Sequence, residues 1–270
     1  MAVSLLFVHA LSSLHPGTGQ GVGAIDLPVA RERATNLPFV AGSTLKGCLK
    51  AEYTGRDEDA VFGKSDQQGR LQVGDARLLL LPVRSLGTTF VWATSPYVLR
   101  RFQRDCQLLE MAKPPEKIGV PGEDEALTAG GLETVAIGGK ARLVLEDLDF
   151  DVRPEAAKEW GNWIADRLFP APEDAEWHAE FLKRFVVLRD QDFDFLCEFA
   201  TEVNAHIKVA TVEDTENNLW YEETLPAETV LVSLLSTEGA MPEGLIRRTL
   251  RLGGNATTGQ GLVRLVGGAQ

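Results

Sequence analysis

A long glycine-rich connection near the amino terminus is the feature that most constrains how this chain can fold. It follows residues 3–11 (VSLLFVHAL), which predict a buried strand, and it ends at residues 42–55, which predict a helix. Glycine is every second residue in GTGQGVG (residues 17–23), so the backbone there has wide conformational freedom. Connections of this length without structure of their own are uncommon in compact domains and are usually functional. We therefore look for the function of the chain here first.

The order of the other expected elements indicates an α+β fold. The first helix would take Ser43 or Thr44 as its N-cap. We expect strands at residues 71–83, 88–95, 141–152, 228–236 and 261–268, a strand–turn–strand at 205–226, helices at 95–112, 155–168, 173–184 and 243–254, and a turn-rich surface loop at 111–135. Because the strands come in pairs, an antiparallel sheet backed by helices is favoured over a doubly wound sheet. A ferredoxin-like or RNA-recognition-motif-like core with a protruding hairpin fits this order.

Composition excludes several classes of protein. The chain has 270 residues, of which 44% are hydrophobic and 24% charged, as in ordinary globular proteins. Its longest apolar run, residues 78–83, is far too short to span a membrane, and the first residues lack the early positive charge of a signal peptide. The three cysteines, Cys48, Cys106 and Cys197, are widely separated, which favours reduced thiols and a cytoplasmic location.

The charge is distributed unevenly along the chain. The net charge is −12, yet residues 1–110 carry +2, residues 111–240 carry −17 and residues 241–270 carry +3. A polyanion could therefore bind at the two ends while the acidic middle faces solvent or basic partners. Net charge alone does not exclude a nucleic-acid partner.

Neither glycine-rich stretch predicts a nucleotide cofactor. In dinucleotide-binding folds the glycines sit at a strand-to-helix turn, whereas here residues 17–23 lead into a segment that Pro28 interrupts.

The second stretch, RLGGNATTGQG (residues 251–261), can donate backbone N–H groups to phosphates. Arg247, Arg248 and Arg251 lie just upstream. Its candidate contacts to a phosphate backbone are Arg251, Gly253, Gly254, Thr257, Thr258 and Gly259; a helix C-cap with a tight turn would explain Gly253 and Gly254 alone.

The first glycine-rich region also carries the candidate chemistry. Asp26 is the sole acid before Arg31; from residue chemistry alone it is more readily a turn-capping residue than a metal ligand. His15 is equally compatible with a general base and with a hydrogen bond at a strand end. Lys46 near the start of the first helix is disfavoured by the helix dipole unless an anion compensates, which predicts a phosphate contact. The remaining candidate cations for RNA are Arg31, Arg33, Lys50, His206 and Lys208.

Four separated blocks together resemble a known family. They are HPGTGQGVGAIDLPVARERATNLPFVAGSTLKG, VGDARLLLLPVRSLGTTFVWATSPYVL, WYEETLPAETVL and RLGGNATTGQGLVRL, in this order. They resemble the repeat-associated mysterious protein superfamily, and within it the backbone subunits of type III-B CRISPR RNA-guided (Cmr) complexes. The sequence departs from the resemblance at Gln260, where a basic residue is expected, and at His206 and Lys208, where relatives tend to carry arginine.

The resemblance implies a fold, a reaction and a set of partners. It implies one domain over residues 1–270, with the core from 1–110 and 225–270 and an insertion with a thumb hairpin at 111–224. Copies would stack along a guide crRNA, each thumb would kink the guide–target duplex, and Asp26 with Mg²⁺ or Mn²⁺ would drive cleavage of single-stranded target RNA. The other implied partners are a large polymerase-like subunit, a small helical subunit and capping subunits. A scaffold that binds guide RNA without cleaving is the alternative.

Overall fold

The computed structural model describes residues 2–19, 21, 23–109, 113–208, 218–246 and 249–267. The side chains of Lys208 and Asn218 lie outside this description, as do Arg247 and Arg248. The helices are α1 (Gly42–Glu52), α2 (Glu58–Phe62), α3 (Pro96–Cys106), α4 (Lys158–Leu168), α5 (Ala175–Arg184) and α6 (Asp190–Phe199), with 3-10 turns η1 (Pro172–Asp174) and η2 (Ala256–Thr258). The expected mixture of helices and strands is confirmed.

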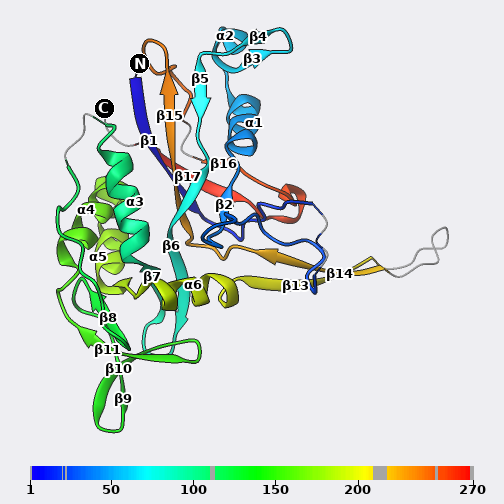
Figure 1. The fold of residues 1–270 in the computed structure, drawn as a ribbon. Coiled ribbons are helices and arrows are strands. Elements are labelled where there is room, and N and C mark those ends of the chain that lie inside the picture. Colours follow the sequence, from blue (N-terminus) through cyan, green and yellow to red (C-terminus); the bar gives the residue numbers. More distant parts are fainter. Residues whose placement is uncertain are drawn as a thin grey trace.

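A large sheet runs through the molecule (Figure 1). The first strands are β1 (Ala2–Ala10), β2 (Phe39–Val40), β3 (Gly63–Lys64), β4 (Gln67–Gln68), β5 (Leu71–Val73), β6 (Ala76–Ser85), β7 (Thr89–Thr94) and β8 (Glu125–Thr128). The others are β9 (Val135–Ile137), β10 (Lys140–Leu145), β11 (Leu148–Arg153), β12 (Phe185–Val187), β13 (Glu202–Lys208), β14 (Asn218–Thr224), β15 (Val230–Thr237), β16 (Thr249–Arg251) and β17 (Leu262–Gly267). The order across the sheet is β16-β17-β1-β15-β6-β7-β12-β8-β11-β10-β9. Strand β1 therefore lies between two strands from the end of the chain, β15 and β17, and is antiparallel to both.

Both faces of the sheet around β1 are covered. Alternate residues of β1 point to opposite faces, as the period of a strand requires. Leu5 and Phe7 belong to one buried cluster, with apolar residues of α3, α4, α5 and α6, whereas Leu6 and Val8 belong to a second cluster with α1 and α2. Figure 1 shows α3, α4 and α5 on one side of the sheet and α1 on the other. This explains why residues 3–11 are almost continuously apolar.

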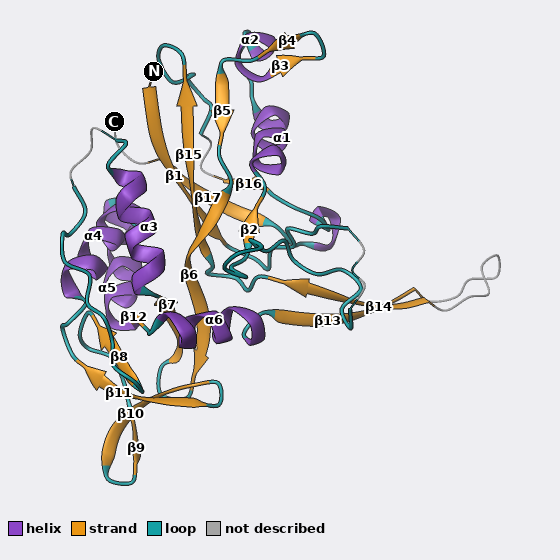
Figure 2. Cartoon of the chain, in the orientation of Figure 1, coloured by secondary structure: helices purple, strands orange, loops and turns teal. Residues whose placement is uncertain are grey.

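Strands β13 and β14 form a two-stranded antiparallel ribbon that extends away from the body of the molecule (Figure 1). The two strands expected within residues 205–226 are confirmed, whereas the turn expected between them, residues 209–217, lies outside the described residues. One face of the ribbon exposes four apolar side chains, Val203, Ile207, Leu219 and Tyr221. The base of the ribbon, by contrast, is held by loops from both ends of the chain, and Figure 2 shows these loop segments gathered beside β14.

For two of the expected elements the structure shows a different type of secondary structure. The described residues of 243–254, which are 243–246 and 249–254, do not form the expected helix: residues 249–251 are strand β16, which pairs with β17. The ladder hydrogen bonds that β17 offers there outweigh a helical preference that is weak for Thr249. Residues 141–152 are not one strand but the hairpin β10–β11, because Glu146 turns the chain in a left-handed conformation with φ 48°.

Two smaller corrections concern the first helix and the surface loop. Helix α1 begins at Gly42, and neither Ser43 nor Thr44 caps it; the Gly42 N–H instead donates to Asp75 Oδ1 at 2.7 Å. A carboxylate at a helix N-terminus satisfies the same unpaired donors as a local cap. Within residues 111–135, strand β8 is not surface loop but pairs with β11 and β12 and buries Ala126.

Candidate functional site

Residues 221–223 of β14 are the point at which two glycine-rich loops meet. The first glycine loop is defined here as residues 15–31 and the second glycine loop as residues 252–261. Leu27 forms a parallel bridge with Glu222: its N–H donates to the Tyr221 carbonyl at 3.0 Å, and its carbonyl accepts from the Glu223 N–H at 2.9 Å. The first glycine loop thus lies along β14 like a short additional strand.

Asp26 is fixed by this pairing but remains exposed. Its Oδ2 accepts a hydrogen bond from the Tyr221 N–H at 2.8 Å, and its carbonyl accepts from the Gly21 N–H at 2.7 Å. These bonds give the carboxylate a defined place at the base of the ribbon while one oxygen stays available to solvent. The turn-forming and the reactive interpretation of Asp26 are therefore compatible with each other.

His15 is buried at the same strand. Its Nδ1 lies 2.7 Å from the Glu223 carbonyl oxygen. Because a carbonyl can only accept, Nδ1 must carry the proton, and Nε2 is left as the acceptor of the neutral ring. The backbone groups that bind Asp26 and His15 are two strand residues apart, about 7 Å. The structure therefore brings both candidate catalytic residues to one segment.

The glycines of both loops close around His15. A Cβ on Gly17 would lie 2.4 Å from His15 Nε2, and a Cβ on Gly253 would lie 2.6 Å from the His15 carbonyl oxygen. Gly253 also has φ +83°, which favours glycine, and the Gly254 N–H donates to the His15 carbonyl at 3.1 Å. The glycines here serve close backbone approach as much as flexibility.

Glu223 anchors the first glycine loop by its side chain. Its Oε2 accepts from the Val29 N–H at 2.9 Å, and its Oε1 accepts from Arg31 Nη2 at 2.6 Å and from the Thr201 hydroxyl at 2.8 Å. Arg31 also donates to the Asn36 carbonyl at 3.0 Å. The predicted RNA ligand Arg31 is thus engaged within the protein, where it fixes the loop.

Glu222 plays the corresponding part for the second glycine loop. Asn255 Nδ2 donates to its Oε2 at 2.5 Å, and Gln260 Nε2 donates to its Oε1 at 3.0 Å. Glu222 and Glu223 were not singled out from the sequence, because two carboxylates in the segment WYEE are typical of a polar strand end. Because they are adjacent in a predicted strand, their side chains must lie on opposite faces of it, and this is the signal that could have identified them.

The other predicted RNA contacts either bind groups of the protein itself or are exposed. Lys46 Nζ donates to the Leu71 carbonyl of β5 at 2.9 Å, and Lys50 Nζ donates to the Gly63 carbonyl of β3 at 3.4 Å. Arg251 Nη1 braces the second glycine loop through the Gln260 carbonyl at 3.0 Å. Arg33, Thr257, Thr258 and Gly259 are exposed, and His206 stacks on Trp220 with the ring centroids 5.5 Å apart.

A divalent ion would find a single protein carboxylate here. Within the residues that the structure describes, no group of three or more His, Cys, Asp and Glu side chains could hold a metal ion. Mg²⁺ commonly binds one or two protein carboxylates and completes its shell with water and substrate phosphate oxygens. Asp26, with one oxygen engaged by Tyr221, fits a divalent ion only together with phosphate oxygens.

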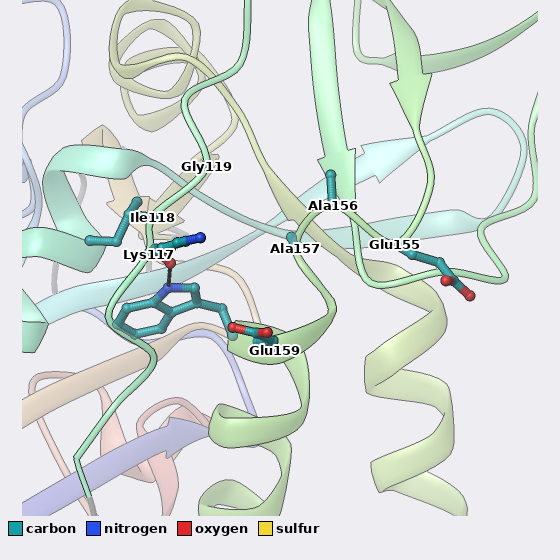
Figure 3. A pocket seen from close by; sticks show the side chains of 8 residues that line it. Lys117, Ile118, Gly119, Glu155, Ala156, Ala157 and Glu159 are labelled. Atoms are coloured by element: carbon teal, nitrogen blue, oxygen red, sulfur yellow. Dashed lines mark hydrogen bonds between the residues drawn. The ribbon is translucent and has the colours of Figure 1, made fainter.

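Other features of the molecule do not suggest chemistry. A cavity of about 520 Å³ on the helical side is lined by Lys117, Ile118, Gly119, Glu155, Ala156, Ala157, Glu159 and Trp160 (Figure 3). The Trp160 Nε1–H donates to the Lys117 carbonyl at 2.8 Å, which closes one wall. Burial raises the pKa of the Cys106 thiol to about 12, so this cysteine stays protonated and unreactive. In the described part of the chain, no helix is long and apolar enough to cross a membrane.

Comparison with known proteins identifies the family. The model of the RAMP superfamily matches residues 7–264. The chain belongs to the RAMP superfamily. It is 31% identical to the CRISPR system Cmr endoribonuclease Cmr4 of Pyrococcus furiosus, with 98% of this chain and 95% of the relative covered. This confirms the resemblance found in the sequence.

Two solved structures are similar to this chain over nearly its whole length. The crystal structure of oligomeric Cmr4 from Pyrococcus furiosus superposes with a TM-score of 0.76 at 26% identity, covering 99% of this chain and 98% of that chain. A chain of the type III-B Cmr-beta complex bound to cognate target RNA gives a TM-score of 0.75 at 19% identity, covering 99% and 97%. The second likeness shows a shared fold.

Proposed function

We propose that this chain is a repeating backbone subunit of a type III-B CRISPR complex that binds guide RNA and cleaves complementary target RNA. The family and the 31% identity to a Cmr endoribonuclease support the class of activity. The observation that carries the proposal is the exposed Asp26 carboxylate, which the Tyr221 N–H holds where the two glycine loops meet beside His15. A cytoplasmic location and assembly with copies of itself and the other Cmr subunits belong to the same proposal.

The geometry favours an internal transfer reaction of the RNA. The ribose 2′-oxygen would lose its proton and attack the adjacent phosphorus while the bond to the 5′-oxygen breaks. The leaving 5′-oxygen takes up a proton from solvent, so that the products are a 2′,3′-cyclic phosphate and a 5′-OH end. His15 Nε2 is the ring nitrogen that can accept a proton, and Asp26 would hold the scissile region in position. When bound by Asp26 and phosphate oxygens, Mg²⁺ or Mn²⁺ would neutralise charge on the scissile phosphate.

The surroundings of Asp26 supply the RNA contacts in this proposal. The second glycine loop, with Thr257, Thr258 and Gly259 exposed, would lie along the guide backbone together with Lys46. The core would be a modified RNA-recognition-motif-like sheet, and the β13–β14 ribbon would act as the thumb. Its exposed apolar face, including Ile207 and Leu219, suits insertion between bases. Splayed nucleotides at its base would then reach Asp26.

The decisive experiment uses the assembled complex with guide RNA and an end-labelled complementary target RNA. Wild type and Asp26→Ala are compared for cleavage and for target binding, each with Mg²⁺ and with chelator. We expect a regularly spaced cleavage ladder that both the substitution and the chelator abolish, while target binding persists. Products with a 5′-phosphate would contradict the proposed reaction.

The second candidate function is a scaffold that binds guide RNA while another subunit cleaves. The donor set favours it, since no group of three or more His, Cys, Asp and Glu side chains that could hold a metal ion occurs among the described residues. Cleavage that survives Asp26→Ala in the complex would establish this alternative and move catalysis elsewhere.

A further inference from the structure

Glu222 is a buried carboxylate with an unusual set of partners. Its side chain is 2% exposed, and among the described residues no Lys or Arg forms an ion pair with it. Buried carboxylates are expensive unless they are paired or fully hydrogen-bonded. Glu222 instead accepts one amide hydrogen bond on each oxygen, from Asn255 at 2.5 Å and from Gln260 at 3.0 Å. Hydrogen bonds to a charged acceptor are the strong ones.

Both amides belong to the second glycine loop, which is also tied on its other side. The Gly254 N–H donates to the His15 carbonyl at 3.1 Å, and the Gly261 N–H donates to the Ser13 carbonyl at 2.8 Å. The loop is therefore clamped between the His15 segment and β14. The segment between the two amide donors contains the exposed residues Thr257, Thr258 and Gly259.

The same carboxylate reaches the outer part of the ribbon. His206 Nε2 lies 3.8 Å from Glu222 Oε1, and this nitrogen is shielded from solvent without a hydrogen bond among the described residues. The His206 ring is nearly parallel to that of Trp220, with 14° between the planes. One side chain thus touches the second glycine loop and the ribbon together.

We propose that Glu222 is a positioning residue that latches the second glycine loop to the β13–β14 ribbon, so that the loop and Asp26 hold a fixed relation to the bound RNA. The proposal rests on the RNA-cleaving function proposed above. The Tyr221 N–H that binds Asp26 belongs to the residue next to Glu222 in β14. The latch therefore fixes the second glycine loop relative to the Asp26 carboxylate. Glu222 would touch no reacting atom itself.

The test exchanges the two partners of one hydrogen bond. Gln260→Glu alone places a carboxylate against Glu222 and should loosen the loop. Adding Glu222→Gln restores an amide facing a carboxylate with the roles reversed, because an amide can both donate and accept. Hydrogen–deuterium exchange of residues 253–261 in the full chain reports on the latch without requiring any RNA cleavage. Leu5 to Val8 in β1 serve as the internal reference.

We expect Gln260→Glu to raise amide exchange in residues 253–261 by about tenfold or more, and the double variant to restore it to within about threefold of wild type. In the assembled complex, target cleavage at saturating RNA should fall and recover in parallel, with target binding changed less. Unchanged exchange in Gln260→Glu would overturn the latch. A loosened loop with a full cleavage rate would overturn its role in positioning. A wild-type complex that fails to cleave would refute the proposed function but leave the exchange result standing.

Discussion

Glu222 and Glu223 are neighbours in β14, yet they bind their loops in different ways. Both are almost fully buried, on opposite faces of the strand. Glu223 is neutralised by the Arg31 guanidinium, whereas Glu222 has two amides and a nearby imidazole. The first glycine loop is thus fixed by an ion pair, and the second by hydrogen bonds from neutral amides. The loop that carries Asp26 should therefore be the more rigid of the two.

Removing the anchor of the first glycine loop should have the largest effect. Glu223→Ala leaves the Arg31 guanidinium, 17% exposed, without its carboxylate and the Val29 N–H without an acceptor. We expect a loss of about 3 kcal/mol or more of unfolding free energy, measured by denaturant titration of the isolated chain. The double variant Glu223→Leu with Arg31→Met should lose less. A loss in Glu223→Ala below about 1 kcal/mol would show that the ion pair is not what fixes this loop.

Asp26, in the first glycine loop, should have a large effect on the cleavage rate and a small effect on the free energy of unfolding. Asp26→Asn keeps an oxygen to accept the Tyr221 N–H but removes the charge. Cleavage of target RNA by the complex should fall at least about a hundredfold, as when a group that stabilises charge at a reacting centre is lost. The matched control is Asp66→Asn, an exposed acid in the β3–β4 turn, which should leave cleavage unchanged. Equal losses in the two variants would argue against a specific role.

The tight packing of the first glycine loop around His15 can be tested by one methyl group. Gly17→Ala places a Cβ against His15 Nε2, and we expect a destabilisation of about 1–3 kcal/mol by thermal or chemical denaturation. Gly47→Ala is the control, since nothing lies within 4 Å of its added Cβ in α1. That substitution should stabilise by about 0.4–1 kcal/mol. Similar signs for the two variants would show that His15 can move aside easily.

The smallest effect is expected at Lys46, away from both anchors. Lys46→Ala removes a hydrogen bond to the Leu71 carbonyl, worth about 1 kcal/mol of stability. If Lys46 also contacts a guide phosphate in the complex, the slope of log binding constant against log salt should decrease in magnitude by about 1. An unchanged slope would assign Lys46 to α1 and β5 alone.

Local patterns predicted the elements with strong local signals. The buried strand expected at residues 3–11 is β1, and the helix expected from residue 95 begins at Pro96, with the Ser95 side chain accepting from the Val98 N–H, although it ends at Cys106. The expected helix at 243–254 failed because the edge of β17 is a tertiary partner that no local pattern reveals. The turn at Glu146 could not be predicted because it contains neither glycine nor proline.

The candidate site divides in the same way. His15 and Asp26 were singled out as candidates because they stand in a glycine-rich stretch and in a block that carries the family resemblance; their catalytic role stays a prediction. Glu222 and Glu223 were missed because their roles depend on partners such as Arg31 and Gln260, which are brought together only by the fold. The internal hydrogen bonds of Arg31 and Lys46 could not be predicted either, because a sequence does not show whether a lysine or arginine binds a group of its own protein.

The pairing of β1 with β15 and β17 has a consequence for synthesis on the ribosome. His15 is bound by a carbonyl 208 residues later in the chain, and Asp26 by an N–H 195 residues later. Contacts this distant form late, because a long loop must be closed before they contribute. A nascent chain can therefore carry Asp26 outside the ribosome long before it has the strand that holds it. The arrangement of His15 and Asp26 on β14 therefore forms only after β14 itself has been synthesised.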